Sequence, residues 1–329
     1  MQNDLETFLS EWNDDRPYVV GHTSGSTGKP KEILLRKDDM RASARLTNEY
    51  FGIDVHSRLL LCLSTSYIAG KMMVVRALEA GAELLTSNVS SHPLKNLDIA
   101  GGRIDLAAMV PMQVEESMKV EEERNALNSI RYLIIGGAAV SSRLEDSLKD
   151  MSVQCFATYG MTETVSHIAL RKLNRDKDYF ALGAVRFRTD ERQCLIIDAP
   201  QLSARVFHTN DVVSLSDDRH FSWLGRYDNV INSGGIKFFP EVIEKKIAAA
   251  MSGRYFISSL PDERLGEKII LVIETGNMDK KSHQEIKDRL MTVLKNLLTS
   301  YEMPKDIVFM PEFRETKSGK ILRKFIPTR

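Results

Sequence analysis

The sequence has few cysteines, no excess charge of either sign and no long apolar run, and each absence excludes a class of protein. Its three cysteines form no CxxC pair, which argues against a disulfide framework and against a structural zinc site. Cys62, Cys155 and Cys194 each lie beside apolar residues, so we expect buried, unreactive thiols. Because no apolar run is long enough to span a bilayer, we expect no membrane insertion.

The charge balance narrows the choice of partners. Lys plus Arg number 45 and Asp plus Glu number 45, for a formal net charge of zero. This balance argues against nucleic acid as a partner and against general binding to anionic membranes. Segment 1–15 is acidic and lacks the basic-then-apolar order of a signal peptide, so we expect a cytoplasmic location.

The chain does contain short apolar strands that alternate with helical segments between residues 58 and 157. This alternation predicts a mostly parallel sheet with helices on its faces, and therefore an α/β fold. After Gly183 the strands become short and turn-rich, which favours a small β-barrel-like part. A helix beginning at Pro240, further strands and a helix over 282–298 predict a small α+β domain. We expect a domain of residues 1–227 and a mobile C-terminal domain of residues 228–329.

A loop of small polar residues separates two strand-like runs, 18–20 and 33–35. Its glycines allow close approach of the backbone to a ligand, while hydroxyls, free N–H groups and two lysines can surround a phosphate. A flexible hairpin loop is the alternative interpretation. A Walker P-loop would need Gly at Thr23, Ser or Thr at Pro30 and a following helix. The loop consists of Thr23, Ser24, Gly25, Ser26, Thr27, Gly28, Lys29, Pro30 and Lys31.

This loop resembles the phosphate-binding signature of the adenylate-forming superfamily, which includes acyl-CoA synthetases, peptide-synthetase adenylation domains and luciferases. The segment Tyr159-Gly160-Met161-Thr162-Glu163 is similar to the YGxTE motif of that family. The resemblance implies that Tyr159 stacks on adenine, Thr162 contacts phosphate and Glu163 contacts magnesium. A carboxylate is also the hard oxygen ligand that Mg²⁺ prefers. A strand end with an ordinary surface Glu is the alternative.

Three further motifs follow the family's order. Gly136-Gly137-Ala138 resembles the turn on the adenine side of the site. Thr209-Asn210-Asp211 resembles the family's TGD, in which the Asp holds the ribose hydroxyls. Asn210 replaces the usual Gly, and since Asn tolerates positive φ we expect a turn there; a plain Asn-Asp turn is the alternative. Gly225-Arg226-Tyr227-Asp228 resembles the family's hinge, with Arg226 on ribose or phosphate and Asp228 as the hinge residue.

Near the end of the chain, Lys317-Ser318-Gly319-Lys320-Ile321-Leu322-Arg323 resembles the family's terminal GK motif. The resemblance implies that Lys320 enters the adenylation site and is catalytic together with Glu163 and Thr162. A basic tail is the alternative. The implied activity is an AMP-forming acid–CoA ligase that uses ATP, Mg²⁺ and CoA on a small-molecule carboxylic acid. Relatives carry a further subdomain before the phosphate loop, so we expect an uncovered face that a partner subunit or a homo-oligomer could bury.

The choice of acid depends on a second resemblance. Residues 63–70, 73–76, 80–82 and 110–113 are similar to segments of o-succinylbenzoate–CoA ligases of menaquinone synthesis. That likeness implies a substrate site with Tyr67 and Gly70 in which Arg76 meets the second carboxylate of the acid, a pairing that suits the guanidinium fork. A solvated Arg76 paired with Glu79 is the alternative. Tyr67 replaces the usual His, so another aromatic acid stays open, as does a nucleotide-binding pseudoenzyme or partner subunit.

Overall fold

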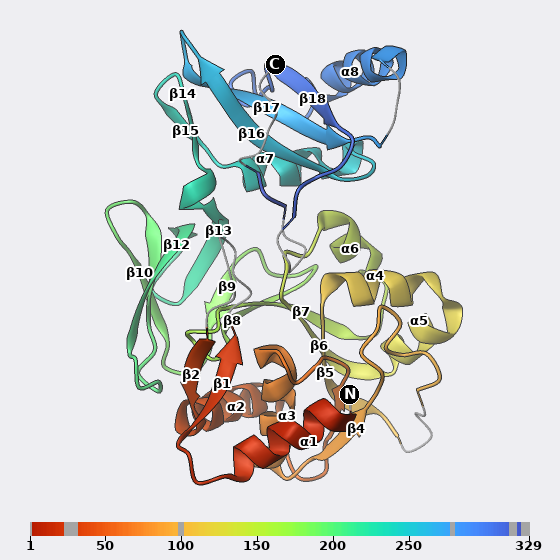
Figure 1. The fold of residues 1–329 in the computed structure, drawn as a ribbon, viewed down its shortest axis with the longest axis vertical. Helices are drawn as coiled ribbons and strands as arrows, with labels where there is room; N and C mark the ends of the chain where they lie inside the picture. Colours follow the sequence, from red (N-terminus) through yellow and green to blue (C-terminus); the bar gives the residue numbers. More distant parts are fainter. Residues whose placement is uncertain (1, 23–31, 98–101, 277–279, 316–320, 324–329) are drawn as a thin grey trace.

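The computed structural model describes residues 2–22, 32–97, 102–276, 280–315 and 321–323. Figure 1 shows an α/β body that contains the N-terminal two-thirds of the chain and a smaller part above it that contains the C-terminal third. An eleven-stranded sheet forms the centre of the body, and a five-stranded sheet forms the smaller part. Among the described residues, no helix combines the length and the apolar character needed to cross a membrane.

The predicted parallel sheet is confirmed in one half of the large sheet. Each strand there pairs in parallel with its neighbour, and short α-helices connect several of them. The strands of this half, from the edge inward, are β4 (Glu83–Thr86), β3 (Arg58–Leu61), β5 (Ile104–Met109), β6 (Ile130–Ile135) and β7 (Gln154–Gly160).

The turn-rich strands expected in a barrel-like part continue the same hydrogen-bonded sheet in antiparallel order. The direction changes at β7, which pairs in parallel with β6 and antiparallel with β8. The antiparallel strands, in sheet order, are β8 (His167–Lys172), β9 (Tyr179–Ala181), β13 (His220–Arg226), β12 (Val206–Leu215), β11 (Cys194–Asp198) and β10 (Arg186–Thr189).

Two hydrophobic cores cover the two faces of the parallel half. Leu59 and Leu61 of β3 belong to one core, while Leu60, between them, belongs to the other, as the alternation of side chains along a strand requires. The helices of the body are α1 (Gln2–Asn13), α2 (Lys37–Phe51), α3 (Ile68–Ala80), α4 (Pro111–Lys119), α5 (Glu121–Asn128) and α6 (Ser142–Ser147). The cysteines are buried as predicted, and burial raises the pKa of Cys62 and Cys155 to about 12.

Local sequence signals account for several helix boundaries. Pro111 occupies the first turn of α4, where proline is favoured because its missing N–H needs no partner. The Ser141 hydroxyl accepts a hydrogen bond from the Leu144 N–H at 3.1 Å and so caps the N-terminus of α6. Helix α2 was not predicted from the sequence, because polar Ser43, Thr47 and Asn48 occupy part of its buried face and interrupt the apolar stripe.

The predicted hairpin at the start of the chain is confirmed as a separate two-stranded sheet. β1 (Tyr18–His22) pairs antiparallel with β2 (Glu32–Arg36), and Val20 lies opposite Leu34. The intervening residues 23–31 lie outside the described part of the chain. In Figure 1 the hairpin lies beside α1 and α2.

The smaller part has a sheet and core of its own. Its strands are β15 (Ile236–Phe238), β14 (Ile231–Ser233), β17 (Gly266–Glu274), β16 (Tyr255–Asp262) and β18 (Asp306–Met310). Its helices are α7 (Pro240–Ile247), η2 (Ala248–Ala250) and α8 (Lys280–Leu294). A single 3-10 turn, η1 (Tyr227–Asn229), leads into it from β13.

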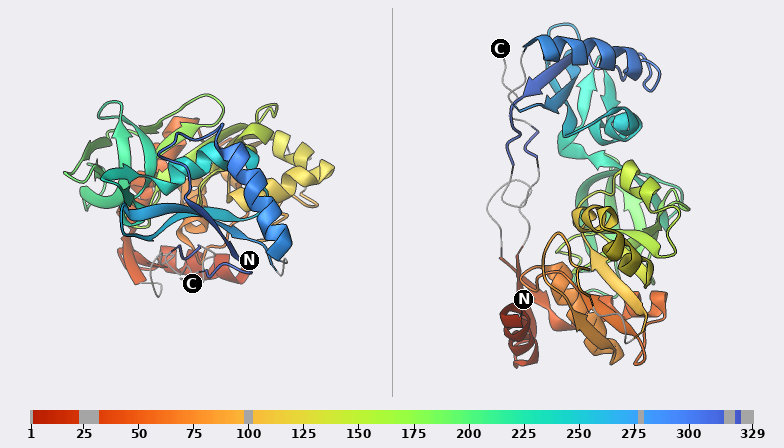
Figure 2. Two further views of the ribbon diagram at one scale, coloured as in Figure 1. Left: turned by 90° about the horizontal axis from the view of Figure 1, so that it is seen from above. Right: turned by 90° about the vertical axis from the view of Figure 1, so that its right-hand side faces the viewer.

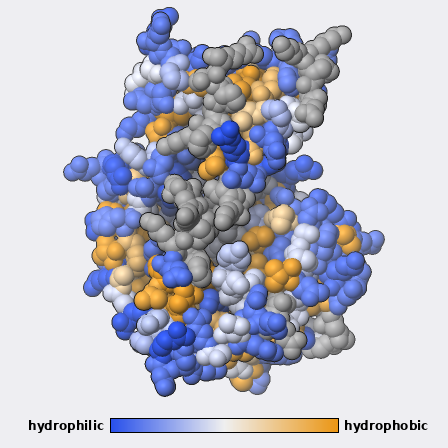
Figure 3. Space-filling view, viewed as in Figure 1, coloured by the Kyte–Doolittle hydropathy of each residue, from blue (hydrophilic) through white to orange (hydrophobic). Residues whose placement is uncertain are grey.

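The space-filling view of the whole molecule shows a mostly hydrophilic face with apolar side chains in separate patches (Figure 3).

Candidate active site

The carboxyl ends of β6 and β7 lie side by side, and each carries a glycine whose space is restricted: Gly136 follows β6, and Gly160 is the last residue of β7. A Cβ at Gly136 would lie 2.3 Å from the Thr158 hydroxyl oxygen, and one at Gly160 would lie 2.3 Å from the Ser166 carbonyl oxygen. Gly137 has a φ of 80°, and Ala138 after it is exposed. Open α/β sheets bind ligands outside the carboxyl ends of their parallel strands, and both glycines lie at such ends.

Three predicted nucleotide-site residues meet beside this edge. Asp211 of β12 is 8% exposed, and its Oδ2 accepts a hydrogen bond from the Tyr159 hydroxyl at 2.7 Å. Arg226 Nη1 lies 3.5 Å from Asp211 Oδ1, and the Trp223 indole N–H donates to the same oxygen at 3.3 Å. Burial, reinforced by the Asp211 charge, raises the pKa of Tyr159 well above its usual value, so the phenol stays a donor. The stacking of Tyr159 on adenine stays a prediction.

The turn expected at Asn210 is wrong. Thr209, Asn210 and Asp211 all lie within strand β12, and Asn210 does not have a positive φ. The Thr209 hydroxyl donates to the Leu195 carbonyl at 2.9 Å and accepts from the Asp211 N–H at 3.0 Å, which fixes the strand locally. Because extended backbone does not require Gly, Asn is accommodated there without strain.

A strained turn between β7 and β8 presents Glu163. Val165 has a φ of 66°, a conformation that β-branched residues rarely adopt and that tends to occur at functional sites. The buried Thr164 hydroxyl holds the turn through bonds to the Met161 N–H at 3.0 Å and the Ser166 carbonyl at 2.9 Å. Glu163 is exposed and has no hydrogen-bond or ion-pair partner among the described residues.

This free carboxylate fits the magnesium contact expected of Glu163. Within the described ranges, no group of three or more His, Cys, Asp or Glu residues could hold a metal ion alone. Protein sites for Mg²⁺ commonly supply one or two carboxylates, and substrate phosphates complete the coordination. Thr162, one residue earlier, is half-buried at the same turn.

Arg76 of α3 is 2% exposed and is the largest fully buried side chain of the described chain. Its Nη2 donates to the Ser166 hydroxyl at 2.8 Å, and its Nη1 lies 3.4 Å from Met73 Sδ. Its Nε has no partner, and no carboxylate in the described residues pairs with the guanidinium. Burial lowers the pKa of Arg76 to about 9.

The alternative interpretation of Arg76, a solvated residue paired with Glu79, is wrong. Glu79 instead accepts from Arg45 Nε at 2.8 Å and lies 3.4 Å from Arg41 Nε, both on α2. Arg76 therefore lies inside the protein with an uncompensated charge, next to the turn that presents Glu163.

Several residues around Arg76 were not predicted from the sequence. The Thr47 hydroxyl lies 3.1 Å from His167 Nε2, and the Ser166 hydroxyl lies 3.5 Å from His167 Nδ1. Asn48 donates to the Arg76 carbonyl at 2.9 Å, and its Oδ1 has no partner. Burial, with the nearby Arg76 charge, lowers the pKa of His167 well below its usual value, so it is neutral at pH 7. Ser166 could have been suspected from the sequence, because it lies three residues after Glu163 of the predicted site.

The two other predicted substrate residues lie at the beginning of α3. Tyr67 precedes the helix and is 63% exposed, while Gly70 packs so closely that a Cβ would lie 2.2 Å from the Ser64 carbonyl oxygen. Since a helix rises ~1.5 Å per residue, Tyr67 and Arg76 are separated by about 13 Å along the axis. The structure therefore does not bring Tyr67 next to Arg76.

The remaining predicted residues lie outside the described part of the chain: Thr23, Ser24, Gly25, Ser26, Thr27, Gly28, Lys29, Lys31 and Lys320. Residues on both sides of segment 316–320 are described. Arg323 binds Glu244 of α7 through two contacts of 2.5 and 2.9 Å, and the Leu322 N–H donates to the Arg314 carbonyl at 2.8 Å. These contacts attach the terminal motif to the smaller part.

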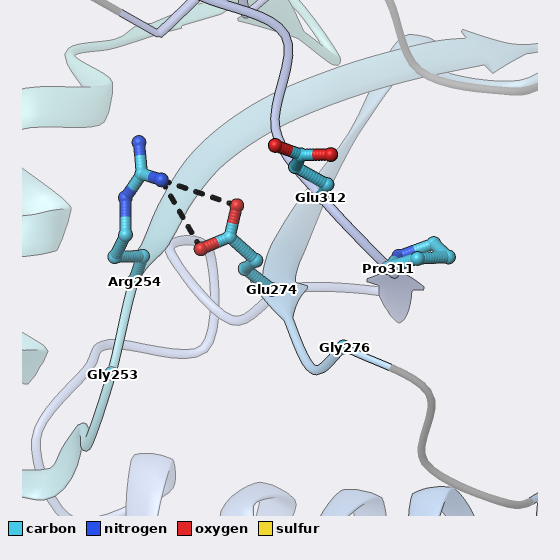
Figure 4. Close-up of a pocket in the computed structure, with 6 residues that line it drawn as sticks. All are labelled: Gly253, Arg254, Glu274, Gly276, Pro311 and Glu312. Atoms are coloured by element: carbon cyan, nitrogen blue, oxygen red, sulfur yellow. Dashed lines mark hydrogen bonds and ion pairs between the residues drawn. The ribbon is translucent and has the colours of Figure 1, made fainter. Parts of the chain in front are cut away.

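An open hollow of about 570 Å³ in the smaller part includes none of the predicted site residues. Its single arginine, Arg254, lies 3.2 Å from both carboxylate oxygens of Glu274, as Figure 4 shows, so its charge is already paired. The residues around the hollow are Gly253, Arg254, Glu274, Gly276, Pro311 and Glu312.

The fold and the site define an adenylate-forming enzyme. Residues 3–203 match the family described as AMP-binding enzyme. An acyl-CoA synthetase (AMP-forming)/AMP-acid ligase II-like protein from Dyadobacter fermentans is 35% identical, with a TM-score of 0.64 over 97% of this chain and 91% of that one. The chain belongs to the AMP-binding enzyme family, and within it is an acid–thiol ligase of the AMP-forming class.

Other relatives are longer than this chain. The 2-succinylbenzoate–CoA ligase of Listeria monocytogenes is 22% identical over 98% of this chain and 72% of its own length. The indoleacetate–CoA ligase of Aromatoleum aromaticum is 26% identical over 93% of this chain and 66% of its own. The O-succinylbenzoate coenzyme A synthetase of Bacillus subtilis, solved with ATP and magnesium, shares the fold with a TM-score of 0.76 at 18% identity, over 93% of this chain and 69% of that one.

Proposed function

We propose that the protein is an o-succinylbenzoate–CoA ligase, which activates this acid with ATP and transfers the acyl group to CoA in menaquinone synthesis. The observation that carries the proposal is Arg76, a buried cation without a counter-charge among the described residues. A buried charge without a partner is costly, and a ligand carboxylate would remove that cost.

The substrate's two carboxylates fit two different roles. One reacts with ATP, and the other is free to bind the guanidinium of Arg76, whose Nε and Nη groups can form a bidentate pair. The Ser166 hydroxyl, already bonded to Arg76 Nη2, adds a polar group beside the same position. Among the relatives, 2-succinylbenzoate–CoA ligases support this choice, while the indoleacetate–CoA ligase supports another aromatic acid as second candidate.

In the first half-reaction, a carboxylate oxygen of the acid attacks the α-phosphorus of ATP. The new O–P bond forms as the bond to the bridging oxygen breaks, and pyrophosphate leaves with the electron pair. The carboxylate is already a nucleophile, so no general base is needed, and catalysis consists of positioning and charge stabilisation.

We assign phosphate binding to loop 23–31, with Lys29 and Lys31, and to Thr162 and Lys320. Glu163 would bind the Mg²⁺ that accompanies ATP. Asp211 and Arg226 bind ribose, while Gly136, Gly137, Ala138, Tyr159 and Gly160 form the adenine side.

In the second half-reaction, the thiol sulfur of CoA attacks the acyl carbonyl carbon. The C–S bond forms, the C–O bond to AMP breaks, and the thiol proton is released to water. One site must first shield the adenylate and then admit a large thiol, so residues 228–329 rotate about Asp228 between the two steps.

Pyrophosphate release from ATP and Mg²⁺ tests the proposal. The assay compares o-succinylbenzoate, benzoate, indoleacetate and a fatty acid, each with and without CoA. We expect release and a CoA thioester with o-succinylbenzoate. Release with another acid alone would discard this substrate and keep the ligase mechanism, and no release with any acid would contradict the catalytic assignment.

A further inference from the structure

The hairpin that leads into the phosphate loop depends on other elements for its position. In the described part of the chain, β1 and β2 pair with each other and not with the large sheet. A two-stranded hairpin alone is marginally stable in water. Helix α1 lies beside it (Figures 1 and 2) and buries Phe8 and Trp12 in the core of the body. Val19 of β1 and Leu35 of β2 are buried in the same core, and α1 is one of the elements that fix the position of the hairpin.

Glu11 of α1 contacts the hairpin and α3 with its two carboxylate oxygens. Its Oε1 accepts a hydrogen bond from the Val20 backbone N–H at 2.6 Å. Its Oε2 accepts one from Lys71 Nζ at 2.8 Å. Val20 lies three residues before Thr23, and Lys71 lies five residues before Arg76 on α3. A single carboxylate thus joins the strand that enters the phosphate loop to the helix that carries the proposed acid-binding arginine.

The contact between Glu11 and Lys71 is largely shielded from water. Their side chains are 16% and 7% exposed. The Lys71 ammonium also lies 4.6 Å from the centre of the Phe8 ring, so two residues of α1 hold it. Salt screens such a pair less than it screens an exposed one, and the geometry is fixed from both sides.

We infer that Glu11 is a positioning residue for adenylate formation, setting the distance between the ATP phosphates and the bound acid. The inference rests on the proposed function: the Lys71 contact acts through the proposed acid site, and the Val20 contact acts through the proposed binding of ATP phosphates by loop 23–31. The attacking oxygen and the phosphorus must approach to about 3–3.5 Å, and a displacement of about 1 Å can cost roughly 100-fold in rate.

Four variants separate the two contacts. Glu11→Gln keeps an acceptor for the Val20 N–H but loses the charge that holds Lys71. Lys71→Met removes the same contact from the other side, and Glu11→Ala removes both. Glu79→Gln is the matched control, because Glu79 is 14% exposed and links α3 to Arg45 at 2.8 Å without touching the hairpin.

Two measurements report on the two contacts. Calorimetry gives the affinity for ATP and Mg²⁺ without acid, and pyrophosphate release gives kcat with whichever acid is turned over. We expect Glu11→Gln and Lys71→Met to keep ATP affinity within about twofold and to lower kcat about tenfold. Glu11→Ala should also weaken ATP binding about fivefold, since a charge-assisted hydrogen bond is lost. Glu79→Gln should retain both values.

Thermal unfolding shows which variants are folded at the assay temperature. If Glu79→Gln lowers kcat as much as Glu11→Gln and Lys71→Met do, or if none of them changes it, the inference is overturned. If Glu11→Ala does not fold, the comparison of Glu11→Gln and Lys71→Met with the control decides. Failure of o-succinylbenzoate as substrate leaves ATP affinity measurable, so loss of affinity in Glu11→Ala would support the inference without the proposed acid.

Discussion

At the scale of single residues, Arg76 links stability to specificity. Its guanidinium is buried without a carboxylate partner in the described chain. Replacing a buried, unpaired charge by an apolar side chain can leave a protein as stable or make it more stable. Binding of a second carboxylate would be lost at the same time, so the two effects should have opposite signs.

We therefore expect Arg76→Leu to raise KM for o-succinylbenzoate about 100-fold, because an ion pair in a desolvated site is removed. KM for benzoate, which lacks the second carboxylate, should change little. The free energy of unfolding in urea should be unchanged or higher. Arg45→Leu is the control, since Arg45 is exposed and contacts Glu79. An equal rise in KM for both acids, or a loss of several kcal/mol in stability, would show a structural role.

His167 makes stability depend on pH. Burial holds the pKa of His167 in the folded chain well below its usual value of 6.5. At pH values between the folded and the unfolded pKa, the unfolded chain therefore binds a proton that the folded chain does not. The contribution to stability is therefore fully present above pH 6.5 and decreases as the pH falls below it. Urea unfolding at pH 7.5, 6.5 and 5.5 should give a steep decrease for the wild type and a shallower one for His167→Gln. A parallel decrease would refute this, and exposed His56→Gln is the control.

At this scale, the motifs predicted which of their own residues lie together but not the other residues around them. The order of the motifs anticipated that Tyr159, Asp211 and Arg226 lie together, and they do. Ser166, His167 and Thr47 were not anticipated, because their roles depend on how α2 packs against β8. Such contacts between distant segments leave no periodic signal in either segment.

At the scale of elements, regular apolar patterns were predictive and polar buried faces were not. The parallel strands were predicted from apolar runs that alternate with helical segments, and the β1–β2 hairpin from two strand-like runs on either side of a loop. Helix α2 was missed because its buried face carries Ser43, Thr47 and Asn48. The turn at Asn210 was wrong because its two neighbours are held in the extended strand β12. The Thr209 hydroxyl donates to the Leu195 carbonyl of β11, and Asp211 pairs with Arg226 of β13. Hydrogen bonds to a neighbouring strand overrode local preference.

The terminal motif gives a prediction at this scale. Lys320→Ala should reduce adenylate formation strongly, by about 100-fold or more, because a charge that stabilises the leaving phosphates is removed. Conversion of supplied acyl-adenylate and CoA to thioester should continue. Arg323→Met should show the same selective loss, because Arg323 anchors the residues after Lys320 to Glu244. Equal loss of both half-reactions in either variant would contradict this role.

At the scale of the whole molecule, the connection between the two parts is a single turn. η1 (Tyr227–Asn229) follows β13, and Asn229 Nδ2 donates to Glu241 Oε1 at 2.6 Å. The α/β class could be predicted from the sequence. The joining of eleven strands into one sheet could not, because pairing of β13 with β9 depends on segments far apart in the chain.

Asp228→Pro tests the proposed rotation. The proline ring fixes φ near −65° and removes an N–H, so it should restrict the change of backbone conformation at this position. We expect one half-reaction to keep its rate and the other to slow at least about tenfold, as for a gating step. Adenylate formation and thiolysis are followed separately by rapid quenching. Normal rates in both would rule out Asp228 as the hinge.

The separate cores of the two parts have a consequence for how such a chain can evolve. The buried clusters of the body end at Phe221, and those of the smaller part begin at Ile231, so no described core residue is shared. Mutations that repack one core leave the other unchanged. A gene encoding this protein could therefore exchange its last third with that of a relative by recombination near residue 228, and each part would bring an intact interior to the hybrid.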